Sequence, residues 1–129
     1  MNNTSKLDIV LAEWIYLLLN NTYNQGTFFL TSKGSYCVVG VLAKCTVLKF
    51  SLIEEQFWFN KQQHSYLMYN IKIPPSVLYK ISTYNDLGYP FKFLAYWLMY
   101  YKKYKTTNHD FSDIKWFLDI KEDIEEYLI

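Results

Sequence analysis

The chain has 129 residues and a mass of 15.5 kDa, enough for one domain with a substantial core. Half of its residues are apolar and a fifth are aromatic, which argues against disorder over most of its length. The formal net charge is only +1 and all thirteen basic residues are lysine, so neither a strong field nor arginine's planar fork favours binding to nucleic acid.

The first predicted helix runs from about Lys6 to Leu19, with Asn3, Thr4 or Ser5 as its N-cap. Apolar residues recur there at three- and four-residue steps and give one wide apolar face. A turn is predicted at residues 24–26, because asparagine and glycine tolerate the left-handed conformation.

A short β-type run at residues 27–30 and a tight turn at residues 32–34 come next. From Cys37 to about Leu48 the spacing suits a buried helix, although the β-branched valines in this run also fit a strand. We favour a helix that begins near Tyr36, with Gly40 permitting the close approach of another backbone.

Residues 55–60 and 65–73 alternate between apolar and polar positions, which predicts two strands joined at residues 61–63. Pro74 and Pro75 end the second strand, because proline cannot donate to a ladder.

A short helix is predicted from Pro75 to about Ser82, because proline suits the first helical turn. Residues 84–88 then form a loop by their chemistry, since Asn, Asp and Gly favour turns. Further helices are predicted from Pro90 to about Tyr104 and, after a polar linker, from about Phe111 to Leu128.

These elements predict an α+β fold: a single compact domain with about four helices packed on a small antiparallel sheet or hairpin. Residues 1–105 form the core domain, and residues 106–129 carry the C-terminal helix, packed on the core or on a partner. The longest apolar run, residues 9–19, is too short to span a bilayer, and the N-terminus lacks a secretory signal. We therefore expect no membrane span and a cytoplasmic location.

The two cysteines, Cys37 and Cys45, are eight residues apart, which is neither a redox-pair nor a zinc-knuckle spacing. We expect both to be reduced thiols. The two histidines are scattered and show no ligand spacing, so we expect no metal and no cofactor.

Several fragments keep a common order over roughly residues 10 to 100. A tryptophan-bearing helix ends before the Tyr-Asn-Gln-Gly segment at 23–26, the sequence YCVVGVL follows at 36–42, and Asn-Asp-Leu-Gly at 85–88 precedes Phe91 and Leu94-Ala95. This order resembles that of small uncharacterised phage and prophage proteins with a YCCLGVL-like segment and a downstream LNDxG…SFxxIA pattern. The resemblance implies a viral or mobile-element origin and an α+β fold, but no activity. The chain departs from the pattern at its second cysteine, which is Val38 here.

Cys37 is the first candidate for chemistry. Near a helix N-terminus its thiolate would be favoured, which suits a nucleophile. A hydrolase would also need a histidine base, His64 or His109, with Asp86 in support, and neither histidine stands in a recognisable motif. A structural Cys37 is therefore favoured, and a cysteine-dependent hydrolase or transferase that uses Cys37, His64 and Asp86 is the alternative.

The Asn85-Asp86 pair is the second candidate. Its side chains could bond their own backbone or cap the next helix. Alternatively, they could lie beside the Cys37 turn and line a pocket for a polar ligand. On that hypothesis the ligand-binding residues are Tyr36, Cys37, Gly40, Asn85, Asp86 and Gly88.

Aromatic residues form two further candidate surfaces. Alternation predicts Phe57 and Phe59 on one face of a strand and Trp58 on the other, and a Tyr/Lys stripe covers residues 96–105. Either surface could stack on a base or a peptide, or form an oligomer interface. The predicted interface residues are Phe57, Trp58, Phe59, Tyr66, Tyr96, Trp97 and Tyr100.

The functional hypothesis is a non-enzymatic accessory binding protein of viral or mobile-element origin. It would counter host defence in the host cytoplasm by binding a host protein or by sequestering a small nucleotide-like ligand, and we expect it to form a homo-oligomer. Nucleic-acid binding through residues 96–105 is the weakest alternative, given the near-zero charge and the absence of arginine. The central expectation is that the Cys37 run and the Asn-Asp-Gly bend meet in space.

Overall fold

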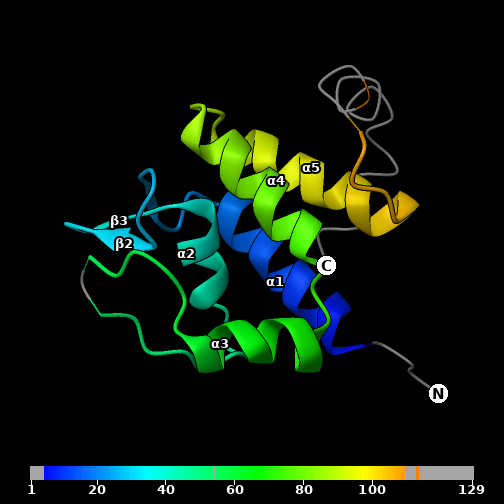
Figure 1. Ribbon diagram of the computed structural model, residues 1–129. Helices are drawn as coiled ribbons and strands as arrows, with labels where there is room; N and C mark the ends of the chain where they lie inside the picture. The colour runs from blue at the N-terminus through cyan, green and yellow to red at the C-terminus, as the bar shows by residue number, and fades with distance from the viewer. Residues whose placement is uncertain (1–4, 54, 110–112, 114–129) are drawn as a thin grey trace.

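The computed structural model describes residues 5–53, 55–109 and 113. This part of the chain contains five α-helices, one π-helical segment and three two-residue strands (Figure 1). In chain order they are α1 (Lys6–Leu19), β1 (Asn24–Gln25), β2 (Thr31–Ser32), β3 (Ser35–Tyr36), α2 (Val38–Ala43), α3 (Lys61–Ser65), the π-helix η1 (Tyr66–Ile71), α4 (Pro75–Asp86) and α5 (Phe91–Tyr104). The predicted α+β class is confirmed.

The core is built around the packing of α1 against α5, with α2 and η1 also against α1 (Figure 1). The helix α1 begins where predicted, with the Ser5 hydroxyl accepting a hydrogen bond from the Asp8 N–H at 3.2 Å. Its buried face includes Trp14, whose indole Nε1–H donates to the Val38 carbonyl at 2.9 Å. This buried bond ties α1 to the start of α2.

The small sheet is mixed, with β3 in the centre. Strands β2 and β3 pair in antiparallel fashion around the predicted tight turn, in which Lys33 and Gly34 both have positive φ. Strand β1 adds to β3 in parallel, which the sequence pattern did not indicate. The β-type run at residues 27–30 does not form a strand.

The helix α2 is shorter than predicted and ends at Ala43, with Cys37 as its N-cap. The predicted close approach at Gly40 is confirmed, because a Cβ atom there would overlap the carbonyl group of Leu30. The chain continues from α2 through hydrogen-bonded turns to Leu48.

The predicted strand pair at residues 55–73 is wrong. Residues 55–60 are irregular, and α3 and η1 occupy residues 61–71. Asn60 and Gln63 form a capping box that starts α3: the Asn60 side chain accepts from the Gln63 N–H at 2.8 Å, and the Gln63 side chain accepts from the Asn60 N–H at 3.1 Å. Leu67 and Ile71 then fall four residues apart on one buried face, which tertiary packing favours over strand alternation.

The helix α4 is one turn longer than predicted and includes Tyr84, Asn85 and Asp86, which were expected in a loop. It packs on α2 and α5. Gly88 follows it with φ of 98°, and the chain then enters α5, which confirms the predicted helix there.

The predicted C-terminal helix, from about Phe111 to Leu128, lies outside the described residues apart from Asp113. In the described part of the chain, no helix has the length and apolar character that crossing a bilayer requires.

Candidate functional site

The Asn85 side chain joins the end of α4 to two distant segments. Its Oδ1 accepts hydrogen bonds from the Val38 N–H and the Gln25 Nε2–H, both at 3.1 Å, and its Nδ2–H donates to the Gly26 carbonyl at 2.9 Å. Asn85 is fully buried. These bonds bring the start of α2 against the end of α4, so the two segments do meet in space as expected.

The neighbouring Asp86 points to the other side of this junction. Its Oδ1 accepts hydrogen bonds from the Phe28 N–H at 3.0 Å and from the Asn85 Nδ2–H at 3.4 Å. Phe28 has a φ of 68°, a conformation that the bond to Asp86 holds in place. The carboxylate therefore fixes an aromatic residue beside the Cys37 turn.

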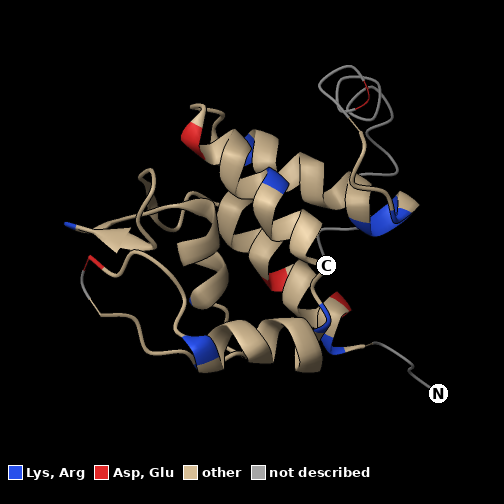
Figure 2. Cartoon of the chain, in the orientation of Figure 1, with Lys and Arg blue, Asp and Glu red and all other residues tan. Residues whose placement is uncertain are grey.

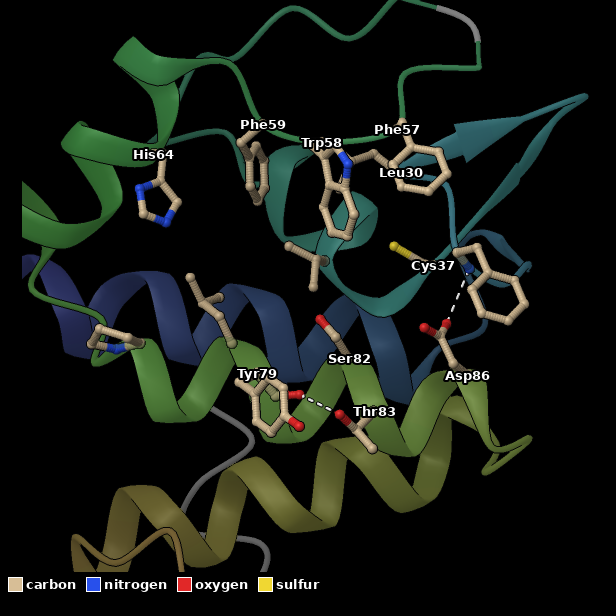
Figure 3. A pocket seen from close by; sticks show the side chains of 14 residues that line it. Leu30, Cys37, Phe57, Trp58, Phe59, His64, Tyr79, Ser82, Thr83 and Asp86 are labelled. Atoms are coloured by element: carbon tan, nitrogen blue, oxygen red, sulfur yellow. Dashed lines mark hydrogen bonds between the residues drawn. The ribbon is translucent and has the colours of Figure 1, made fainter.

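A pocket of about 430 Å³ opens at this junction (Figure 3). One side is the face of α4 with Tyr79, Ser82 and Thr83, and the other is the segment 57–59, called here the aromatic wall (Figure 3). The fourteen lining residues are Phe28, Leu30, Cys37, Val39, Phe57, Trp58, Phe59, His64, Pro75, Leu78, Tyr79, Ser82, Thr83 and Asp86.

The pocket has a buried floor and an exposed aromatic rim. Leu30, Cys37 and Val39 in the floor are almost fully buried. In the rim, Trp58 is 72% exposed and Tyr79 is 73% exposed. Large aromatic side chains are usually buried, and clustered aromatic rings that stay exposed are typical of a binding surface.

Glutamine side chains hold the aromatic wall in place. The Leu30 N–H donates to the backbone carbonyl of Gln56 at 2.8 Å, which joins the residue before the wall to the floor. The Gln56 Nε2–H donates to the Trp58 carbonyl at 2.7 Å, and to the Gln63 side chain of α3 at 3.3 Å. Phe57 packs edge-on against Trp58, with ring centroids 4.6 Å apart. The wall is therefore built without any strand.

The Cys37 thiol is only 7% exposed and caps α2, with its Sγ accepting from the Gly40 N–H at 3.4 Å. Burial raises the pKa of this thiol, and the hydrogen bonds from Gly40 and Val39 oppose that shift without overcoming it; the Asp86 charge adds to the increase. The expected stabilisation of the thiolate by the helix start is therefore outweighed by desolvation. Cys45 is also buried, and its pKa is raised for the same principal reason.

The two histidines occupy different places. His64 lines the pocket at the end opposite Cys37, with Phe59 and Trp58 between them in the view of Figure 3. His109 lies outside the pocket and is buried between Trp97 and Tyr100, at ring-centroid distances of 4.5 and 4.4 Å. Its Nε2 is 3.0 Å from the Trp97 carbonyl oxygen, so His109 packs on α5 and does not serve Cys37.

Two of the six predicted ligand-binding residues, Cys37 and Asp86, line the pocket. The other four do not line it. Asn85 is buried with its polar atoms bonded inside the protein, and Gly40 packs on Leu30. Tyr36 and Gly88 also lie outside the pocket lining, Tyr36 because its ring packs edge-on against Tyr23 with centroids 4.8 Å apart.

Some of the aromatic residues predicted to form an interface line the pocket, and others lie elsewhere in the fold. Phe57, Trp58 and Phe59 all line the same pocket, so the expected alternation between two faces is wrong. Tyr66 is half-buried against Phe50, and Tyr96 and Tyr100 are half-buried on α5.

Trp97 is fully buried in the core, which corrects its expected place on an interface. The stripe at residues 96–105 is therefore not one continuous exposed surface.

Sequence reasoning missed the contribution of α4 to the site. Pro75, Leu78, Tyr79, Ser82 and Thr83 recur at three- and four-residue steps and end one turn before Asp86. This spacing was visible in the sequence, but the predicted helix stopped at residue 82. Extending the helix would have put these residues and Asp86 on one face.

The pocket is poor in charge. Among the lining residues that the structure describes, Asp86 is the only aspartate or glutamate and none is lysine. On the same helix, the Lys80 ammonium group donates instead to the Thr107 carbonyl and the Asn108 side chain. Figure 2 shows one basic position at the start of α3, one basic position on α4 and an acidic residue at the C-terminal end of α4.

No protein family, no curated protein and no solved structure matches this chain. Among the described residues, no group of three or more His, Cys, Asp or Glu side chains could hold a metal ion.

Proposed function

We propose that the protein is a non-enzymatic binding protein that holds a small ring-bearing ligand between α4 and the aromatic wall. The observation that carries this proposal is the pocket of about 430 Å³ with its buried apolar floor and aromatic rim. Pockets of roughly this size, with apolar walls and few polar groups, are typical of small-molecule sites.

The state of Cys37 supports a binding role over catalysis. A nucleophilic cysteine needs a low pKa and a nearby base. The pKa of Cys37 is raised by burial, its sulfur accepts a backbone N–H, and His64 lies at the other end of the pocket (Figure 3). These features suit a thiol that caps a helix and forms part of an apolar floor.

The lining favours the base of a nucleotide-like ligand over its phosphate group. A base could stack on Trp58 or Tyr79, because every base has a π-face. A phosphate group would find no lysine in the pocket lining and would meet the Asp86 carboxylate. A base or nucleoside therefore fits the pocket better than a nucleotide.

A second candidate is docking of a host protein, and the exposed rim favours it. Phe28 is 59% exposed and lies with Trp58 and Tyr79 around the pocket mouth. A partner could insert an apolar side chain into the pocket while covering these rings, as aromatic anchors do in protein interfaces. We also propose a viral or mobile-element origin, which is based on the resemblance of the sequence motifs, and the formation of a homo-oligomer.

Isothermal titration calorimetry with adenosine, guanosine, the neutral indole tryptophol and adenosine monophosphate tests the small-ligand proposal. We expect the nucleosides or tryptophol to bind with a dissociation constant of about 10 µM to 1 mM, and the monophosphate to bind more weakly. Trp58→Ala should weaken binding, whereas Tyr69→Ala, at an exposed tyrosine outside the pocket, should not. Binding of none of the ring compounds would contradict the proposal.

A further inference from the structure

The electrostatics of the pocket select among ring-bearing ligands. We propose that the preferred ligand is an organic cation, whose ring packs on the aromatic wall while its charged nitrogen reaches Asp86. This inference rests on the proposed function and adds to it the charge of the ligand. Three observations carry it: the free side of the carboxylate, the aromatic faces beside it and the missing counter-charge.

The Asp86 carboxylate has bonding capacity left for a ligand. Both of its hydrogen bonds from the protein, from the Phe28 N–H and the Asn85 amide, go to Oδ1. Within the described ranges nothing bonds to Oδ2. Ionised carboxylates accept several hydrogen bonds, and those from cationic donors are the stronger ones.

The carboxylate is held in place before any ligand arrives. Asp86 is anchored through Phe28 on one side, and the adjacent Asn85 is fixed by its buried bonds to Val38 and Gly26. A ligand amine would therefore meet an acceptor whose position is already set, which lowers the ordering cost of binding.

Aromatic faces supply the second attraction. Trp58 and Phe57 from the wall and Tyr79 from α4 line the same pocket. Tryptophan and tyrosine attract cations through the negative face of the ring, and this attraction grows when water is excluded. A ring with an attached ammonium group can use both attractions.

Among the described residues of the lining there is no lysine, so a cation meets no ammonium group from them. Lys80 on α4 is bonded to the 107–108 segment. A neutral ligand displaces water from the Asp86 carboxylate without offering it a counter-charge, whereas a cationic ligand supplies one.

Three indoles that differ in charge test this inference: tryptamine, tryptophol and indole-3-acetate, titrated calorimetrically at pH 8, where a primary amine is still charged. We expect tryptamine to bind about fivefold more tightly than tryptophol, and indole-3-acetate more weakly than both. The advantage of tryptamine should shrink as salt is added, because the charge lies at an exposed rim.

Asp86→Asn should bring the dissociation constants of tryptamine and tryptophol within about twofold of each other, because it removes the charge while an amide oxygen can still accept the Phe28 N–H. Glu55→Gln is the matched control, because it removes the same charge at an exposed position that is not part of the lining, and it should keep the preference. If tryptophol binds as tightly as tryptamine in the unmodified protein, the inference fails while the proposed function stands. If none of the three indoles binds, the inference fails, and the proposed function fails with it when adenosine and guanosine do not bind either.

Discussion

The side-chain oxygen of Asn85 accepts a hydrogen bond from the Val38 N–H at 3.1 Å, across 47 positions of sequence. Val38 is the first residue of α2, where a backbone N–H has no partner within the helix. The Val38 carbonyl is bonded in turn to the Trp14 indole. One peptide segment at the pocket floor is thus held by two other helices.

Replacing Asn85 should be costly, because it would leave the Val38 N–H and the Gly26 carbonyl without their side-chain partner at a buried site. We expect Asn85→Ala to lower the free energy of unfolding by about 3 kcal/mol in urea denaturation. Asn20→Ala is the control, because Asn20 bonds only the Tyr16 carbonyl and is exposed. An equal loss in both variants would contradict the role of Asn85.

The close approach of Gly40 and Leu30 predicts a sharp difference between two glycines. A Cβ at position 40 would overlap the Leu30 carbonyl oxygen and come within 2.7 Å of the carbonyl carbon. The backbone at residue 40 or at Leu30 therefore has to move. We expect Gly40→Ala to cost about 3 kcal/mol or more, or to prevent folding. Gly34→Ala has open space and only the positive φ to oppose it, so it should cost about 1 kcal/mol. Thermal unfolding of both variants measures the difference.

The raised pKa of Cys37 predicts a slow thiol. At pH 7 its thiolate fraction should be smaller than that of a free cysteine, so iodoacetamide should modify it at least about tenfold more slowly in the folded protein than in urea. A Cys45→Ala background isolates the Cys37 signal. Rapid modification in the folded state at neutral pH would favour the nucleophile hypothesis instead.

The same shift has a consequence for stability. Because folding raises the pKa of Cys37, its contribution to stability is fully present below the ordinary thiol value of about 8.5 and declines as pH rises above it. We expect the free energy of unfolding in urea to fall between pH 7 and pH 10, and to fall less in Cys37→Ala than in the unmodified protein. If the free energy of unfolding falls equally steeply with pH in that variant, the pKa of Cys37 does not change on folding.

His109 predicts a loss of stability on the acid side. Burial lowers the pKa of its imidazole, and the hydrogen bond to the Trp97 carbonyl only partly opposes this. The unfolded chain therefore takes up a proton near the ordinary value of about 6.5 while the folded chain does not, so the stabilisation present above that pH declines as pH falls below it. Between pH 7.5 and pH 5, the free energy of unfolding in urea should decline less in His109→Gln than in the unmodified protein. His64→Gln, at an exposed histidine, is the control and should decline as the unmodified protein does.

The local features of the chain were enough to predict several elements. The helices at residues 6–19 and 91–104 were found because their apolar periodicity and caps agree with their packing. The hairpin turn at Lys33 and Gly34 and the tight contact at Gly40 were also found, since each depends on backbone conformation at one or two positions.

Elements whose structure depends on distant partners were mispredicted. Asn85 and Asp86 favour turns locally, yet they end a helix because Val38, Gly26 and Phe28 supply their hydrogen-bond partners. Residues 65–73 satisfy a strand pattern as well as a helical one, and packing of Leu67 and Ile71 into the core selects the helical one.

The sequence by itself determined the α+β class, because apolar periodicity and turn chemistry are local properties. That the Cys37 run and residues 85–86 meet was an expectation, which the hydrogen bond between Val38 and Asn85 confirms. Only the tertiary structure decided that Asn85 holds the site together while Asp86 faces the pocket. These two neighbours differ in role because helix geometry turns successive side chains in different directions, and what each one meets is set by segments many residues away.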